Sequence, residues 1–322
     1  SLFLFIPYIK MKKKASLLCS ILLLLLLAAC HSGKKEKDYT QSLKIGYIPS
    51  TDILPYVVAQ QLGIYDSLDL DLKLMPMESK KNRDTLFQQK KTDGSILSPV
   101  EAFTQQKQGI QIVPTLTNEG LHYIVASNDS NFTKPEQLKE KSLSVARASS
   151  SGFFADKVLE KLEINQDDIN KPELNNGQLR MQMLSNGQID AAVLRDPYIA
   201  NTVQKGCKVL LSSSSYPIIL SVTAFSDSIL NTKKEDIKKL IIGYNLAVQY
   251  MNEHPQEEWL TKAASTAGLY SIAQKLPSFK KTSKLSVAQT KEIIQWMLEN
   301  DFLPKSYSNY RMDNSVLDQI YK

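Results

Sequence analysis

Two stretches of this sequence repeat one order of signals, and that order limits the folds open to the chain. Residues 92–113 and residues 187–211 each contain a short apolar run, a proline, a helical segment, a glycine and a second apolar run. Proline opens a helix readily and glycine ends one, so each stretch predicts a strand, a helix and a strand. The repeat is too long for a solenoid unit. Two similar α/β lobes are expected, with ordinary α/β sequence grammar as the alternative explanation.

Strands and helices alternate along most of the remaining chain. Strands are predicted at 43–48, 70–74, 95–97, 110–116 and 142–146, and helices at 54–62, 85–91, 152–162 and 178–185. This alternation is typical of βαβ units and predicts mostly parallel sheets. From residue 231 the pattern is helical, with capping boxes expected at Thr232 with Glu235 and at Ser286 with Gln289. A core-facing stripe at helical spacing is predicted for Ile237, Leu240, Ile241, Tyr244, Val248 and Met251.

The composition excludes several classes of protein. The chain has 322 residues and is 43% hydrophobic, enough to bury a core and unlike collagen or a disordered chain. Its net charge of +6 includes four lysines before residue 30, a region without acidic residues. Without those four lysines the net charge is +2. We therefore expect no nucleic-acid partner.

Residues 11–30 have the pattern of a secretory signal. A lysine-rich head is followed by the apolar stretch 15–29, which at 15 residues is shorter than the ~20 that a membrane-spanning helix needs. The segment Leu27-Ala28-Ala29-Cys30 resembles the bacterial lipobox, which implies cleavage before Cys30 and a lipid on its thiol. We expect a signal peptide over 1–29, with the start at Met11, and a lipidated tether over 30–42. The alternative is an uncleaved anchor helix.

Cysteine and histidine usage argues against a disulfide or a metal centre. Cys19 leaves with the signal and Cys30 carries lipid, so Cys207 is alone and is predicted to be a buried, inert thiol. The three histidines have no metal-ligand spacing, and no cofactor is expected. Enzyme motifs such as G-x-S-x-G, the P-loop, G-x-G-x-x-G and H-E-x-x-H are absent.

Three loops have residues suited to binding a small molecule, namely 49–56, 147–154 and 194–198. Ligands of α/β proteins bind at the carboxyl ends of strands, where helix N-termini offer N–H groups. Each loop alone is equally well explained by helix capping. We predict that the ligand-binding residues are Asp52, Tyr56, Ser98, Glu119, Ser149, Ser150, Ser151, Phe153, Arg195 and Asp196.

The chain resembles a known family in four segments. These are "LKIGYIPSTDILPYVVAQQLGIYD", "DGSILSPVEAF", "LSNGQIDAAVLRDPYIANTVQKG" and "GYNLAVQYMNEHPQE". Over about residues 43–320 they resemble the substrate-binding proteins of nitrate/sulfonate/taurine-type ABC importers, a family that includes binders of thiamine-precursor pyrimidines. The family's usual aromatic-Glu-Pro-Tyr motif is Arg195-Asp196-Pro197-Tyr198 here.

The resemblance implies a bilobal type II periplasmic-binding-protein fold, with two α/β lobes that close over a ligand in a cleft. Lobe 1 would comprise 43–121 plus 217–322 and lobe 2 would comprise 122–216, with two hinge crossings near 121–126 and 216–224. The protein would be a monomeric, lipid-anchored receptor in the bacterial cell envelope, facing the periplasm or the outside of the cytoplasmic membrane. It would deliver a small organic solute to a permease and its ATPase without catalysis.

Two questions stay open at this point. The alternative function is an enzyme on the same fold, such as a pyrimidine synthase or a dehydratase, although those synthases use a cysteine-rich motif and Cys207 has no cysteine neighbour. A sulfonate- or nitrate-like anion is favoured by Arg195 and the serines of the second loop. A heteroaromatic, pyrimidine-like ligand is favoured by Asp52, Glu119 and Asp196, with Tyr56 or Phe153 stacking on it, and the greater number of acids slightly favours this second class.

Overall fold

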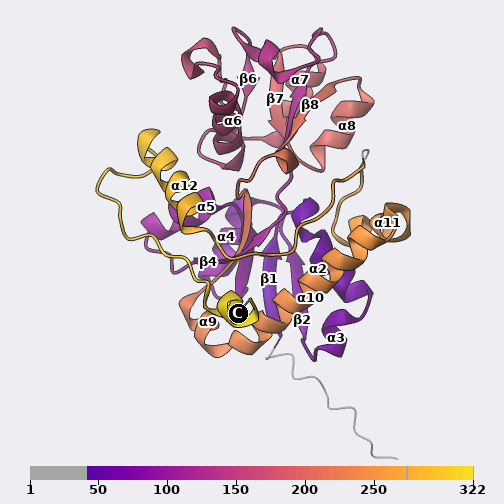
Figure 1. Cartoon of the computed structure of the whole chain (residues 1–322), viewed down its shortest axis with the longest axis vertical. Helices are drawn as coiled ribbons and strands as arrows, with labels where there is room; N and C mark the ends of the chain where they lie inside the picture. Colours follow the sequence, from indigo (N-terminus) through magenta and orange to yellow (C-terminus); the bar gives the residue numbers. More distant parts are fainter. Residues whose placement is uncertain (1–41, 273–274, 322) are drawn as a thin grey trace, which may run out of the picture. The chain divides into compact units, whose positions relative to one another are not determined.

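The computed structural model of the protein describes residues 42–272 and 275–321, which form two mixed β-sheets and twelve helices (Figure 1). The expected signal peptide, Cys30 and the tether up to residue 41 lie outside the described residues. Within the described part of the chain, no helix is both long and apolar enough to cross a membrane.

The first sheet has five strands in the order β2-β1-β3-β9-β4. Their bounds are β1 Leu43–Tyr47, β2 Leu72–Pro76, β3 Gly94–Leu97, β4 Val113–Asn118 and β9 Ser221–Phe225. The second sheet has four strands in the order β6-β7-β5-β8. Their bounds are β5 Tyr123–Ala126, β6 Leu143–Ser144, β7 Ala191–Leu194 and β8 Lys208–Ser212. All nine strands are short, and β6 is shorter than the predicted 142–146 because its neighbouring residues make only isolated bridges.

Each sheet contains one strand that runs against its partners, so the expectation of mostly parallel sheets is only partly correct. In the first sheet β9 is antiparallel to β3 and β4, and in the second β5 is antiparallel to β7 and β8. Both are the first strands after the chain passes from one sheet to the other. A strand entering from the neighbouring sheet begins at the edge where the other strands end. The beginnings of β5 and β9 therefore join the carboxyl ends of the remaining strands.

The helices around the first sheet are α2 Leu54–Gln61, α3 Ile64–Ser67, α4 Lys80–Gln88, α5 Pro99–Lys107, α9 Asp227–Thr232, α10 Lys234–Glu253, α11 Gln256–Thr266, α12 Val287–Glu299 and α13 Ser315–Ile320. Those of the second sheet are α6 Ser150–Lys161, α7 Gly177–Ser185 and α8 Tyr198–Gln204. The prolines predicted to start these helices do so, since Pro99 lies in the first turn of α5 and Pro197 is the N-cap of α8. Gly109 and Gly206 follow these helices with φ of +84° and +86°, a conformation that glycine adopts without strain.

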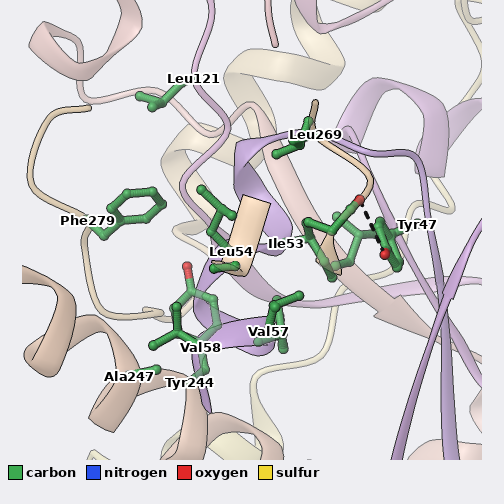
Figure 2. Packing of buried hydrophobic residues seen from close by; sticks show 14 of the residues in the cluster. Tyr47, Ile53, Leu54, Val57, Val58, Leu121, Tyr244, Ala247, Leu269 and Phe279 are labelled. Carbon is green, nitrogen blue, oxygen red and sulfur yellow. Dashed lines mark hydrogen bonds between the residues drawn. The ribbon is translucent and has the colours of Figure 1, made fainter. Parts of the chain in front are cut away.

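The long helix α10 packs on α2, and Figure 2 shows the contact. The whole predicted stripe is buried: Ile237, Leu240, Ile241, Tyr244, Val248 and Met251. Tyr244 meets Tyr56 of α2 edge to face, with the ring centroids 4.8 Å apart. At Gly243 a side chain would collide with the ring of Tyr65, so glycine lets α10 approach α3 closely. The hydrophobic pattern therefore predicted this core correctly.

The capping box predicted at Thr232 with Glu235 is wrong. Thr232 is the last residue of α9 and donates its hydroxyl to the Ser228 carbonyl at 2.8 Å, while α10 begins after Lys233 without a side-chain cap. The short helix α9 uses the residue that would have capped the long one. Half of the box predicted at Ser286 is present: the Ser286 Oγ accepts the Gln289 N–H at 3.4 Å, whereas the Gln289 side chain donates to the Pro217 carbonyl.

Candidate functional site

A cavity of about 290 Å³ lies where the carboxyl ends of strands from both sheets meet. Six of the ten predicted ligand-binding residues line it: Asp52, Ser149, Ser150, Ser151, Arg195 and Asp196. Asp52 follows β1 of the first sheet, and the other five follow β6 and β7 of the second. Residues that are distant in sequence thus lie together at the ends of strands, where ligands of α/β proteins bind.

The first wall of the cavity belongs to the first sheet and comprises Asp52, Lys80, Arg83 and Glu101. Both Lys80 and Arg83 pair with the Glu101 carboxylate, and Arg83 also pairs with Asp84 at 2.8 Å. Burial opposes ionisation of Glu101, but the two cations and the Ser98 N–H outweigh it and hold the pKa of this carboxyl well below its usual range. These charged side chains form ion pairs with one another.

Asp52 is almost fully buried, at 3% exposed. Its carboxylate accepts the hydroxyls of Ser50 and of Ser221, the latter at 2.8 Å from the start of β9. The nearest cation is Arg195, whose Nη2 lies 4.0 Å from Asp52 Oδ2 on the opposite side of the cavity. The two walls are therefore close enough to contact one small molecule.

The second wall belongs to the second sheet and comprises His122, Arg180, Arg195 and Asp196, together with the start of α6. Gly152 lies in the first turn of this helix, where any side chain would collide with the Arg147 carbonyl. The three serines use their hydroxyl groups locally. Ser149 caps the helix by accepting the Ser151 N–H at 3.1 Å, and it donates to the Ala146 carbonyl at 2.6 Å. Ser151 bonds the same carbonyl at 3.3 Å.

His122 lies directly before β5 and was missed by the sequence analysis. Its Nδ1 is 3.2 Å from the Gly120 carbonyl, which can only accept, and its Nε2 is 2.9 Å from Ser150 Oγ. Burial lowers the pKa of His122 to about 3, and the positive charges of Arg195 and Arg180 contribute. The neutral ring therefore donates through Nδ1 and accepts the Ser150 hydroxyl hydrogen at Nε2. Ser150 consequently presents lone pairs to the cavity.

Arg180 on α7 is a second residue that the sequence did not reveal. It is 7% exposed, and it donates to the backbone carbonyls of Val193, at 3.2 Å, and Leu174. In the described part of the chain it makes no ion pair. Burial and the neighbouring Arg195 lower its pKa to about 10, so it is a cation at neutral pH. A buried positive charge without a carboxylate partner favours an anionic ligand.

Asp196 is a buried acidic residue of the same wall, and it favours a hydrogen-bond donor on the ligand rather than an anionic group. The residue is 1% exposed, lines the cavity, and has no hydrogen-bond partner for either carboxylate oxygen among the described residues. Burial raises its pKa to about 7, although the Arg195 guanidinium opposes this rise. A hydrogen-bond donor on a ligand would satisfy these oxygens.

Four predicted site residues do not line the cavity. Tyr56 and Phe153 are core residues rather than stacking platforms, because Tyr56 donates to Asn118 Oδ1 at 2.7 Å and Phe153 packs on Trp296 at 5.3 Å between ring centroids. Ser98 is the N-cap of α5 in a capping box with Glu101. Glu119 lies in a separate depression near Lys280, 4.0 Å away.

The cavity contains a serine and a histidine in contact, the pair that hydrolases use as nucleophile and base. Ser150 and His122 form a serine–histidine contact, but protonation of this imidazole is opposed by burial and by two arginines. The described residues contain no group of three or more His, Cys, Asp or Glu that could hold a metal ion. Cys207 is a buried free thiol, as the sequence predicted. The arrangement is suited to holding a small polar molecule.

Comparisons with solved structures identify the fold. The aliphatic sulphonate binding protein SsuA from Escherichia coli aligns with a TM-score of 0.68 and 16% identity, covering 85% of this chain and 94% of that protein. The nitrate-binding protein NrtA from Synechocystis PCC 6803 aligns with a TM-score of 0.64 and 13% identity, covering 82% and 83%. The Candida albicans CA3427 gene product, which has the generic periplasmic binding protein fold, aligns at 0.57 and 20% identity, covering 87% and 94%. The bilobal periplasmic-binding-protein fold predicted from the sequence is thereby confirmed.

Comparison with curated protein sequences gives no match. A family model gives one. The model described as "NMT1/THI5 like" matches residues 50–258, well over half of the chain, and the protein is therefore a member of the NMT1/THI5-like family.

Proposed function

We propose that this protein is the solute receptor of an ABC importer. The observation that carries the proposal is the second wall, where, among the described residues, buried Arg180 has no ion-pair partner and buried Asp196 has no hydrogen-bond partner. Such groups destabilise the free protein and gain interactions when a ligand enters. Membership of the NMT1/THI5-like family and the fold shared with SsuA and NrtA support the same function.

The ligand that fits these groups is a small organic anion carrying an N–H or O–H donor. Arg180 and Arg195 supply the positive charge, since the serine hydroxyls are already engaged. Asp196 and the lone pairs of Ser150 accept from the donor. A pyrimidine-like ligand is less well supported, because Tyr56 and Phe153 lie in the cores. The structure thus favours the anion over the heteroaromatic class that the count of acids suggested.

We propose that capture involves closure of two lobes. Lobe 1 would be 43–121 plus 217–322 and lobe 2 would be 122–216, so that each lobe holds one sheet. The crossings would be the segments between β4 and β5 and between β8 and β9. Small-angle scattering of the protein with a bound solute would then give a smaller radius of gyration than without it.

We further propose that the receptor is a monomer anchored by a lipid on Cys30 and facing the periplasm or the outside of the cytoplasmic membrane. There it would pass its solute to a permease and its ATPase. Cys30→Ser removes the only acylation site and is expected to leave an uncleaved, unlipidated precursor. A fatty-acid label retained by that variant would contradict the lipobox interpretation.

Calorimetry tests the ligand class with matched probes. Ethanesulfonate and 2-hydroxyethanesulfonate differ by one hydroxyl donor, while nitrate lacks a carbon chain and 4-aminopyrimidine lacks an anionic group. We expect 2-hydroxyethanesulfonate to bind more tightly than ethanesulfonate in the wild type, and the difference to vanish in Asp196→Ala, which removes both acceptor oxygens. Tighter binding of 4-aminopyrimidine than of either sulfonate would overturn the anion assignment.

The enzyme alternative is tested separately. Ser150 contacts the His122 ring in the cavity, so a serine-directed fluorophosphonate would label Ser150 if His122 acted as a base. With the pKa of His122 lowered to about 3, we expect no labelling at neutral pH. Labelling that is lost in Ser150→Ala, or turnover of a bound solute, would favour an enzyme.

A further inference from the structure

Helix α12 contacts both halves of the molecule. Its Ile293, Ile294 and Met297 belong to the same buried cluster as Val100 and Phe103 of α5, the helix that follows β3 of the first sheet. On the side of the second sheet, α12 contacts α6 through Trp296. This helix therefore joins the two sheets outside the chain crossings.

A buried hydrogen bond lies at the centre of the contact with α6. Trp296 Nε1–H donates to Asp156 Oδ2 at 2.9 Å, and both residues are 6% exposed. The other carboxylate oxygen, Oδ1, accepts from Lys171 at 2.8 Å. The ring of Trp296 also packs edge to face on Phe153, one turn earlier on α6. A charged acceptor makes this a strong hydrogen bond.

Two further contacts extend the same interface. Lys157 of α6 pairs with Glu292 of α12 at 2.7 Å, and the Arg147 guanidinium lies 6.0 Å from the ring centroid of Phe302. Arg147 precedes α6, and Phe302 follows α12. Aromatic, hydrogen-bonded and ionic contacts thus lie together along α6, α12 and the residues next to these helices.

The first turn of α6 separates this interface from the ligand cavity. Ser149, Ser150 and Ser151 line the cavity, whereas Arg147, Gly152 and Asp156 line a depression of about 210 Å³ that also contains Trp296. The start of α6 therefore contributes residues both to the cavity and to the depression beside α12. The interface exists in the arrangement that brings Arg195 within 4.0 Å of Asp52.

We propose that the α6–α12 interface is a latch that holds the second sheet against the first with the two cavity walls close together. The latch residues are Phe153, Asp156 and Lys157 on α6 and Glu292 and Trp296 on α12. Its consequence for ligand capture rests on the proposed function. The latch itself is tested without a ligand, so its failure and that of the transport proposal are distinguishable.

Tryptophan fluorescence provides the test because the chain has two tryptophans. In Trp259→Phe, Trp296 alone reports on the latch, and we expect its emission to be blue-shifted and poorly quenched by acrylamide. Adding Asp156→Leu removes the acceptor, and Glu292→Gln removes the ion pair. Loss of a hydrogen bond to a charged group corresponds to an opening equilibrium about 10- to 150-fold larger, with a matching rise in quenching for Asp156→Leu.

A matched control keeps the result specific. Asp227→Asn removes a carboxylate that pairs with Arg311 at 2.7 Å far from α6, and we expect no change in the quenching of Trp296. Scattering from Trp296→Phe, which keeps a ring but loses the N–H, is expected to show a larger radius of gyration than the wild type. Unchanged quenching in folded Asp156→Leu, or an equal rise in Asp227→Asn, would overturn the latch.

Discussion

The two walls of the cavity contain similar residues but differ in whether their charged side chains are paired. In the first wall Glu101 pairs with Lys80 and Arg83, Arg83 also pairs with Asp84, and the Ser98 N–H donates to the Glu101 carboxylate. In the second wall Arg180 binds only backbone carbonyls and Asp196 has no hydrogen-bond partner among the described residues. Paired buried charges hold the fold together, whereas unpaired ones cost stability and leave binding capacity. The comparison separates scaffold from candidate binding surface.

The largest effect on stability is expected from breaking the first wall. Glu101→Gln leaves the 3%-exposed Arg83 side chain with one fewer carboxylate, and removing one partner of a buried pair costs about 3–5 kcal/mol. The lowered pKa of Glu101 means that the wild type keeps this contribution at neutral pH and loses it only in strong acid. Urea denaturation at pH 7 measures the difference. A loss below about 1 kcal/mol would show that the pair is not structural.

A substitution in the second wall is expected to stabilise the protein rather than destabilise it. The pKa of Asp196 is about 7 in the fold, above its ordinary 3.8, so the wild type loses stability as the pH rises through this range. Asp196→Asn removes that cost. We expect up to about 4 kcal/mol of added stability at pH 8 and little change at pH 4. Thermal denaturation of both proteins at the two pH values checks this. Destabilisation at pH 8 would mean that Asp196 has a partner in solution.

Ligand affinity tests the second wall directly. Arg195→Ala removes a fork-shaped cation and is expected to weaken binding of 2-hydroxyethanesulfonate by about 10- to 150-fold. Asp196→Ala is expected to weaken it within the same range if the hydroxyl donates to the carboxylate. Calorimetry at pH 8 measures both. If neither variant changes the affinity of the folded protein, the loop 194–198 only begins helix α8 and does not bind the ligand.

The smallest effect is expected from the caps. Ser98→Ala removes the N-cap of α5 and costs about 1 kcal/mol of stability, without a change in affinity because Ser98 does not line the cavity. Ser149→Ala removes the corresponding cap of α6, which does line it. Comparing denaturation and calorimetry for the two variants tests the division. A change in affinity for Ser98→Ala would place it in the binding surface.

Local sequence patterns predicted the α/β elements and the loops well, because hydrophobic periodicity and proline–glycine punctuation act over a few residues. They also brought Asp52 together with Arg195, since strand ends meet at one edge. They could not orient Tyr56 or Phe153, which lie on helices whose inward faces are decided by packing partners far away in sequence.

Arg180 was invisible for a related reason. It lies on a helix without a motif, and its significance comes from the carbonyls of Leu174 and Val193 and from the absence of a described acidic partner. His122 had a weak signal, its position directly before a strand that begins at the crossing. The capping box at Thr232 failed because two helices follow one another so closely that one residue could belong to either.

The position of β9 has a consequence for the order in which the chain becomes structured. This strand lies between β3 and β4, and β4 has no other partner in its sheet. The second sheet uses only strands between residues 123 and 212, so all of its strands are synthesised before β9. β3 and β4 meanwhile expose unpaired edges, which are templates for aggregation. Until residue 225 is available, β4 has no partner strand and the first sheet cannot be completed.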